Sequence, residues 1–401
     1  MRTLISFIGT GSLDKEKSDR KYRTATYTIN GMEVGTDSFV SSVLFHHFKI
    51  DRLILIGTTR SMWEEVYEQF AKKRGVSFDE EYYYKLGGWA EANNHSTPLD
   101  SFDMSTLETT LGNNSKVRLI PYGLNVEEQW NTFNILTEVF QDLGEGEEIF
   151  LDVTHAFRSL PIFSMTSLFY LQDVLQKSVK LKGIYYGMLE TSKEFNNKAP
   201  IVDLSLILKI QEWVKGAHSF LNYGKGYLLA DLLENKSQAV VLNQFSDALS
   251  LNYLTEIETQ LKNFKKLADQ IESPIAKMIL PPVLGDFTNK LLRSKTQSRF
   301  QLELSIWHRK NKNYFSAFLV FTESLITYVC EQEFGKWAKL SYRGQAKLRM
   351  DKFGLNEIYQ EAKTIRNNLA HNQKKKTNTV NNNIVFLTKS QNQFLQKILS
   401  N

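Results

Sequence analysis

The feature that most constrains the fold is a change of sequence pattern near Asp203. Before this residue, short apolar runs alternate with helical patterns, whereas long helical patterns alone follow it. Strands that are buried on both faces and separated by helices are typical of a parallel, doubly wound sheet. The sequence therefore predicts an α/β domain with such a sheet over residues 1–203 and an all-helical (all-α) region over residues 204–401.

The elements of both halves can be assigned from hydrophobic periodicity and from turn residues. The predicted strands are short and rich in β-branched or aromatic residues, and cover 4–9, 52–57, 117–123, 148–155 and 181–189. Helical patterns lie between them at 38–48, 61–75, 127–144 and 159–176. In the second half, helical patterns cover 204–224, 248–272, 287–312, 314–334 and 355–370, with a predicted break at 274–286.

Composition excludes some classes of protein. The chain has 401 residues, a formal net charge of +5 and a single cysteine, Cys330, so no disulfide framework can form within it. No stretch approaches the roughly 20 apolar residues of a membrane span. We expect a soluble, cytoplasmic protein without a membrane partner, and the mild positive charge is compatible with a polyanionic ligand.

Three predicted strands end in unusual polar sequences: FIGTGS (7–12), IGTTRSMW (56–63) and LDVTHAFRSLP (151–161). Glycines allow a close backbone approach, and hydroxyls, histidine and arginine supply donors for a phosphate or a ribose. A plain turn, a helix N-cap, or a loop capped by Asp152 that pairs with Arg158 would explain the same residues. No carboxylate cluster or histidine pair with metal spacing accompanies them, so we expect no metal there.

These motifs, with YRTATYTINGMEVGTDSF (22–39) between the first two, resemble in their order one subfamily of CARF domains, the Rossmann-like sensors of CRISPR-associated effectors. The resemblance implies a cyclic oligoadenylate activator, with cyclic tetra-adenylate as the expected ring. It also implies that the ring lies across the two-fold interface of a homodimer. The residues implied for ligand binding are Thr10, Gly11, Ser12, Thr58, Asp152, Thr154, His155 and Arg158.

The stretch IRNNLAHN (365–372) ends the helical pattern at 355–370. We expect Asn356 to cap this helix and Ile358, Ala362, Ile365 and Leu369 to form its buried stripe. Two side chains that are five residues apart lie roughly 140° from each other on an ideal helix. Arg366 and His371 therefore do not stack, and a basic helix end is the simplest interpretation.

The pattern R-N-x3-H at the end of a helix also resembles the ribonuclease motif of HEPN domains, which follow CARF domains in type III CRISPR ribonucleases. The resemblance implies connecting helices over 204–290, a catalytic core over 291–401, and Arg366, Asn367 and His371 as catalytic residues. It implies metal-independent cleavage of single-stranded RNA at a site shared by a homodimer or a higher oligomer, without a cofactor. A non-catalytic sensor or RNA-binding dimer, and a sensor domain that also degrades its ring, remain alternatives.

Overall fold

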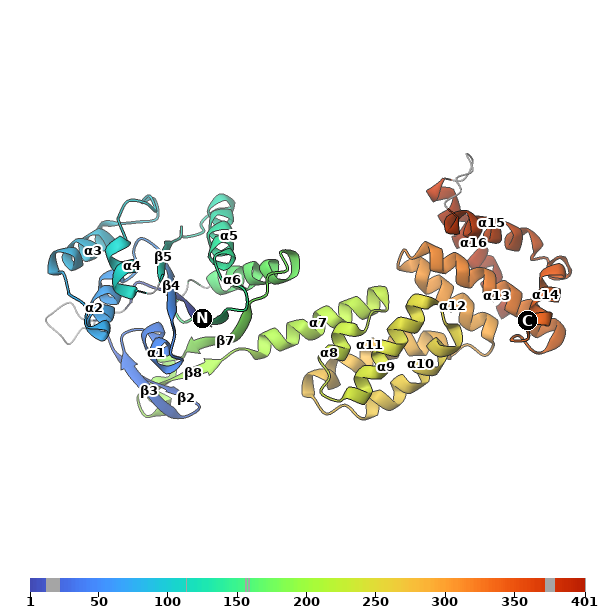
Figure 1. The fold of residues 1–401 in the computed structure, drawn as a ribbon, viewed down its shortest axis with the longest axis horizontal. Coiled ribbons are helices and arrows are strands. Elements are labelled where there is room, and N and C mark those ends of the chain that lie inside the picture. Colours follow the sequence, from blue (N-terminus) through green and yellow to red (C-terminus); the bar gives the residue numbers. More distant parts are fainter. Residues whose placement is uncertain (12–21, 113, 156, 158, 372–378, 401) are drawn as a thin grey trace. The chain divides into compact units, whose positions relative to one another are not determined.

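The computed structural model describes residues 1–11, 22–112, 114–155, 157, 159–371 and 379–400. The chain divides into two compact units, Met1–Ile207 and Leu208–Asn401 (Figure 1). The predicted ligand-binding residues Ser12 and Arg158 lie outside the described residues.

An eight-stranded sheet forms the centre of the first unit, in the order β3-β2-β8-β7-β6-β1-β4-β5. Its strands are β1 (Arg2–Ile8), β2 (Ala25–Ile29), β3 (Met32–Asp37), β4 (Arg52–Gly57), β5 (Lys116–Leu119), β6 (Glu148–Asp152), β7 (Lys180–Gly187) and β8 (Lys198–Asp203). The run β7-β6-β1-β4-β5 is parallel throughout. It confirms the five predicted strands, although β5 ends at Leu119 and β6 at Asp152, earlier than expected.

The sheet extends beyond the predicted parallel part. A hairpin, β2–β3, and strand β8 add three strands at one side, with antiparallel pairing of β2 to β3 and of β7 to β8. The hairpin turns at Asn30 and Gly31, which both have positive φ, of 50° and 79°. Asn-Gly is the residue pair that a two-residue hairpin turn of this kind favours. The sheet is therefore mostly, not entirely, parallel.

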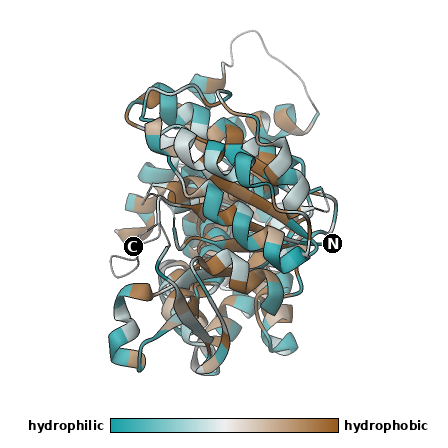
Figure 2. Cartoon of the chain, turned by 90° about the vertical axis from the view of Figure 1, so that its left-hand side faces the viewer, coloured by the Kyte–Doolittle hydropathy of each residue, from teal (hydrophilic) through white to brown (hydrophobic). Residues whose placement is uncertain are grey.

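Helices cover the sheet because their apolar faces pack against hydrophobic strands, which Figure 2 colours brown. They are α1 (Val40–His47), α2 (Trp63–Arg74), α3 (Glu80–Ala92), α4 (Ser105–Leu111), α5 (Val126–Gln141) and α6 (Leu160–Phe169). A π-helical turn, η1 (Tyr170–Val174), prolongs α6, and a 3₁₀ turn, η2 (Leu189–Phe195), follows β7. Helices α5 and α6 lie side by side (Figure 1).

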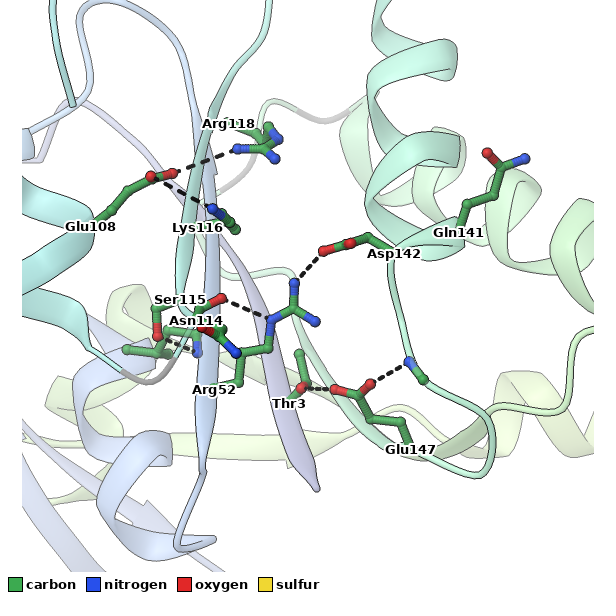
Figure 3. Close-up of polar contacts among 12 residues, drawn as sticks. Thr3, Arg52, Glu108, Asn114, Ser115, Lys116, Arg118, Gln141, Asp142 and Glu147 are labelled. Carbon is green, nitrogen blue, oxygen red and sulfur yellow. Dashed lines mark hydrogen bonds and ion pairs between the residues drawn. The ribbon is translucent and has the colours of Figure 1, made fainter. Parts of the chain in front are cut away.

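Buried polar residues stabilise the amino-terminal edge of the sheet (Figure 3). Arg52, at the start of β4, donates through Nε to the Asn114 carbonyl at 3.1 Å and pairs with Asp142 at the end of α5. Glu147, just before β6, accepts from the Gly144 amide at 2.6 Å and from the hydroxyl of Thr3. The contacts of Arg52 with Asn114 and of Thr3 with Glu147 each join the start of a strand to the segment that leads into a neighbouring strand.

The second half is helical, as the sequence predicts. Its helices are α7 (Leu206–Tyr223), α8 (Tyr227–Asp231), α9 (Lys236–Leu251), α10 (Leu254–Asp269), α11 (Pro274–Leu292), α12 (Gln297–Lys310), α13 (Tyr314–Phe334), α14 (Leu340–Leu348), η3 (Met350–Phe353), α15 (Asn356–Ala370) and α16 (Val380–Leu399). Within the described residues, no helix is both long and apolar enough to cross a bilayer.

The predicted break at 274–286 is wrong, because α11 runs through it with Pro274 at its start and Pro281 and Pro282 inside. Buried Leu280 and Phe287 anchor this helix in the core, which outweighs the hydrogen bonds that the two prolines cannot make. Conversely, the pattern at 248–272 is not one helix. Asn252 adopts a left-handed conformation, with φ of 54°, and separates α9 from α10.

Helix α16 is joined to α12 by a buried polar network. The Gln391 side chain is fully buried, donates to the Ser305 hydroxyl at 2.6 Å, and accepts from Arg309 Nε at 2.6 Å. The Ser305 hydroxyl in turn donates to the Ala317 carbonyl of α13. The last helix is therefore part of the core of this unit, although the sequence there contains only one short apolar run, IVFL at 384–387.

Candidate functional site

The carboxyl-terminal ends of β6, β1 and β4 lie next to one another, because these three strands are neighbours and parallel. The three polar motifs of the sequence follow these strands directly. In parallel α/β sheets, ligands bind in the crevice beyond the carboxyl ends of the strands. The fold therefore brings the described residues of all three motifs to one edge of the sheet.

The loop after β1 approaches its surroundings closely. A Cβ on Gly9 would lie 3.0 Å from the His155 carbonyl oxygen, so only glycine fits there without a shift. Gly11 has φ of +67°, and a Cβ on it would lie 2.4 Å from the ring of Tyr22. Thr10, between the two glycines, is exposed. The two glycines thus hold a loop that presents the Thr10 side chain to solvent.

The loop after β4 is held by its own hydrogen bonds. The Ser61 hydroxyl donates to the Ile8 carbonyl at 2.5 Å and accepts from the Thr58 amide at 3.0 Å, which ties the loop to β1. Trp63 Nε1 donates to the Thr58 carbonyl at 2.9 Å. Thr58 is only 4% exposed, so its side chain contributes to the loop's packing in this structure. The exposed member of the motif is Arg60, which the sequence analysis did not select.

Asp152 is the centre of the loop after β6. It is fully buried, and its Oδ2 accepts from the Ser6 hydroxyl at 2.6 Å. Its Oδ1 accepts from both the amide and the hydroxyl of Thr154, at 3.0 and 2.6 Å. The Thr154 hydroxyl also accepts from the Gly187 amide at 2.8 Å, which links β6 to β7. Asp152 therefore orients the loop through hydrogen bonds, as the alternative of a capped loop anticipated.

His155 lies half-buried beside the first residue of α1. Its Nε2 is 3.5 Å from the Val40 backbone nitrogen, in position to accept that hydrogen bond. Burial lowers the pKa of His155 below its ordinary value, while the carboxylates of Asp152 and Glu190 act in the opposite direction. The imidazole is therefore neutral near pH 7, and it can serve as a hydrogen-bonding group without carrying a charge.

One member of this region was missed in the sequence. Tyr22 packs against Gly11, and its hydroxyl donates to Glu64 Oε1 at 2.7 Å, near the start of α2. It closes one side of the β1 loop. It follows a polar stretch of sequence that has no hydrophobic periodicity, although the motif that begins with it contributed to the family resemblance.

The second candidate site is the end of α15. The helix begins at Asn356, and Leu355 occupies the capping position without a side-chain hydrogen bond, so the expected Asn356 cap is wrong. Ile358, Ala362 and Ile365 are buried as predicted, but Leu369 is 46% exposed. The apolar stripe therefore ends one turn before the helix does.

Side-chain hydrogen bonds join two of the three predicted catalytic residues, Arg366 and Asn367. Arg366 is half-buried, and its Nε and Nη2 donate to Asn367 Oδ1 at 3.2 and 2.9 Å. The His371 amide donates to the Asn367 carbonyl at 2.9 Å, while its side chain is exposed at the helix end. Within the described part of the chain, no hydrogen bond joins the Arg366 and His371 side chains. A single chain presents the two groups separately.

Charged groups from three helices lie near Tyr359, and they are Arg366 of the same helix, Arg343 of α14 and Glu323 of α13. Arg343 of α14 donates to Thr327 at 3.1 Å and pairs with Glu323 of α13. Burial raises the pKa of Tyr359, while the nearby Arg366 and Arg343 lower it and Glu323 raises it further. Arg343 is thus neutralised by Glu323, whereas no ion pair of Arg366 is seen among the described residues. Among the described residues, no group of His, Cys, Asp and Glu side chains is arranged to hold a metal ion.

Comparisons with known proteins agree with the fold of the first unit. The family model for the CARF domain of the CRISPR system endoribonuclease Csx1 matches residues 3–190. A second family model, for the second domain of CRISPR-associated protein MJ1674, matches residues 209–296.

Among curated proteins, the chain is similar to CRISPR-associated protein MJ1674 of Methanocaldococcus jannaschii, with 35% identity over 350 residues. The alignment covers 82% of this chain and 54% of that protein, so the chain spans about half the length of the curated relative it matches. Among solved structures, Enterococcus italicus Csm6 bound to cyclic hexa-2′-fluoro-hexa-dAMP matches with 13% identity and a TM-score of 0.39, which is a weak structural similarity. That match covers 100% of this chain and 94% of Csm6. Residues 3–190 therefore form a CARF domain of the Csx1 type, in a chain that is similar over most of its length to CRISPR-associated protein MJ1674.

Proposed function

We propose that the chain is a cyclic-oligoadenylate-activated, metal-independent endoribonuclease of type III CRISPR antiviral defence that cleaves single-stranded RNA. The observation that carries this proposal is the union, in one chain, of a Csx1-type CARF domain with a helix that ends in Arg366, Asn367 and His371. The N-terminal unit would bind the activator at the loops after β1, β4 and β6. The helical unit would cleave the RNA.

The chemistry follows from the residue types at the end of α15. The Arg366 guanidinium would hold the scissile phosphate and the charge that develops on it. The His371 imidazole would accept the proton of the 2′-hydroxyl or donate one to the departing 5′-oxygen. Attack of the 2′-oxygen on phosphorus breaks the bond to the 5′-oxygen and leaves a 2′,3′-cyclic phosphate and a 5′-hydroxyl. Two copies would supply two such sets around one axis.

Activation requires a difference in affinity between two arrangements of the dimer. The activator would bind more tightly to the arrangement in which the two sets of Arg366 and His371 face each other, and would shift the population toward it. In one chain, Arg366 is engaged by Asn367 and His371 stands apart. This separation is compatible with a site that is complete only between two chains. It is equally the observation that favours the second candidate, a sensor without catalysis.

The test of this function is cleavage of a fluorescent single-stranded RNA in the presence of EDTA with cyclic tri-, tetra- or hexa-adenylate. We expect one ring to start cleavage, with tetra-adenylate as the expected ring, and the products to carry 2′,3′-cyclic phosphates. Tight binding of a ring without any cleavage would replace the nuclease with the non-catalytic sensor. Shortening of the ring itself, followed by chromatography, would reveal degradation by the CARF domain.

Homodimerisation through the sensor unit is supported by an apolar groove between α5 and α6. The groove has a volume of about 340 Å³ and is lined by Val126, Gln129, Trp130, Phe133, Ile162, Phe163 and Thr166. Trp130 is 62% exposed and Ile162 is 68% exposed, an arrangement that water disfavours and a second protein surface would cover. The groove begins where α5 and α6 leave the carboxyl edge, so a partner seated on it would adjoin the candidate ligand loops.

We expect Trp130→Glu to weaken the dimer at least roughly tenfold, because a buried aromatic anchor would become a charge inside an apolar interface. Analytical ultracentrifugation measures the dimer dissociation constant, and the binding of cyclic tetra-adenylate measures the ligand site. Tyr84→Glu is the matched control, since Tyr84 is 71% exposed on another helix. A Trp130→Glu protein that keeps both its dimer affinity and its ring binding would contradict the assignment of this groove.

A further inference from the structure

Three aromatic rings from three different loops meet near the carboxyl edge of the sheet. Tyr122, three residues after β5, contacts Phe157, five residues after β6, with ring centroids 5.4 Å apart and planes inclined by 55°. His95, from the loop between α3 and α4, lies 6.5 Å from Tyr122. The sequence analysis selected none of the three as a ligand-binding residue.

The order of the strands shows where along the sheet edge Tyr122 contacts Phe157. Strands β6 and β5 are separated by β1 and β4, so their ends lie roughly 14 Å apart at the usual strand spacing. Loops of three and five residues can reach about 10 and 17 Å. The two loops therefore meet only by converging across the ends of β1 and β4. Thr10 and Gly11 follow β1, and Thr58 follows β4.

A hydrogen bond attaches the loop that carries His95 to the loop after β4. Asn93, two residues before His95, donates through Nδ2 to the Thr59 carbonyl at 3.4 Å. Thr59 belongs to the loop after β4. The loop that carries His95 is thus attached to the ligand edge. The three rings border the same crevice as the glycine and threonine loops.

The exposure of the rings indicates a use other than core packing. Phe157 is 43% exposed and Tyr122 is half-buried, whereas the sheet core keeps its large aromatic side chains almost completely covered. Aromatic rings held with a face toward solvent are suitable for stacking with nucleobases, and the stacking of each base contributes strongly to binding. Glycine and threonine loops are suited to phosphate and ribose, so the two kinds of residue would divide a nucleotide between them.

We propose that Tyr122 and Phe157 form a stacking platform for a purine base of the ligand that binds beyond β1 and β4. This inference rests on the proposed function, because cyclic oligoadenylate presents one adenine for each phosphate. With the phosphate at the loop of Thr10 and Gly11, a neighbouring adenine inserts against the two rings. In a two-fold dimer the platform occurs twice, on opposite sides of the ring.

The experiment measures binding of cyclic tri-, tetra- and hexa-adenylate to the full chain by isothermal titration calorimetry. The variants are Tyr122→Leu, Phe157→Leu and Tyr122→Phe, with Tyr84→Leu as a matched control for loss of an exposed tyrosine. We expect each leucine variant of the platform to weaken binding roughly tenfold to a hundredfold, and Tyr122→Phe and Tyr84→Leu to bind like the wild type.

A second readout separates stacking from a change in loop structure. A cyclic tetra-adenylate that contains 2-aminopurine in place of one adenine loses fluorescence when the base stacks. We expect quenching in the wild type and in Tyr122→Phe, and its loss in Tyr122→Leu, with circular dichroism showing that each variant is folded. If the wild-type protein binds a ring, and both leucine variants bind it as tightly and quench its fluorescence as strongly, the platform is overturned but the proposed function is not. A wild type that binds no ring would overturn the platform and the proposed function together.

Discussion

Arg366→Ala and His371→Ala are each expected to lower activator-dependent RNA cleavage at least roughly 100-fold. Arginine loss removes the group that stabilises the developing phosphorane charge, and histidine loss removes the proton transfer; each effect has about this size in other enzymes. The measurement is the initial rate of cleavage of a fluorescent single-stranded RNA in EDTA, with saturating activator. Binding of the activator should be unchanged, because both residues belong to the helical unit.

The control for these variants is Thr364→Ala, an exposed residue of the same helix α15. It should cleave RNA at the wild-type rate. Asn367→Ala should give a smaller loss, because Asn367 accepts two hydrogen bonds from Arg366 and orients that side chain. If Arg366→Ala and His371→Ala cleave as fast as Thr364→Ala, the end of α15 is not the active site and is only a basic helix end.

The stability of the helical unit is expected to fall by about 3 kcal/mol as the pH drops from about 7 to about 4. His308 of α12 is 1% exposed, and neither ring nitrogen has a hydrogen-bond partner among the described residues. Burial lowers the pKa of His308 from 6.5 to about 4. His308 therefore becomes protonated below about pH 6.5 in the unfolded chain but only near pH 4 in the folded chain. The free energy of unfolding falls over that pH window.

Urea denaturation followed by circular dichroism, in wild type and in His308→Leu, measures this effect. Leucine fills a similar volume and does not titrate, so the difference in unfolding free energy between the two proteins should grow as the pH falls. Carboxylates that titrate near pH 4 contribute equally to both proteins and cancel in the difference. An unfolding free-energy difference that stays constant from about pH 7 to about pH 4 would show that His308 has the same pKa in the folded and the unfolded chain.

The parallel part of the sheet could be predicted because its strands are buried on both faces and consist of short apolar runs. Strands β2, β3 and β8 could not be read in this way, since their exposed and half-buried positions carry polar residues such as Thr26, Thr36 and Glu33. The Asn30-Gly31 pair, flanked by β-branched residues, was the one local signal for the hairpin. Pairing with β8, which is far away in the chain, is a tertiary effect that a local pattern does not contain.

The helical half shows two limits of local rules. Proline normally interrupts a helix, yet α11 continues through Pro281 and Pro282 because tertiary burial of its apolar residues dominates. Along α15 the helical period places Leu369 with the buried residues, but the last turn of the helix extends beyond the hydrophobic core and leaves this side chain exposed. Both errors arise because the extent of the core depends on neighbouring helices, which the periodicity of one segment does not report.

The candidate sites were found unequally well. The motifs after β1, β4 and β6 could be grouped in advance, because parallel strands place their carboxyl ends at one edge. What could not be predicted was which side chains of each motif face inward: Asp152 and Thr58 are buried, whereas Thr10 and Arg60 are exposed. The contact of Tyr122 with Phe157 depends on how two loops fold across intervening strands, and no spacing in the sequence encodes that distance.

The two edges of the sheet have different tolerance for evolutionary change. At the amino-terminal edge, Arg52 and Glu147 are buried and bound to Asp142, Asn114, Thr3 and Gly144, so a substitution there would disturb the fold itself. These contacts are separate from the loops at the opposite edge. Exposed positions of those loops, such as Thr10 and Arg60, can therefore diverge in sequence while the sheet remains folded, whereas buried members such as Asp152 are held against the strands. Exchanging the exposed residues of the loops after β1, β4, β5 and β6 between relatives would accordingly change the surface at this edge and leave the strands in place.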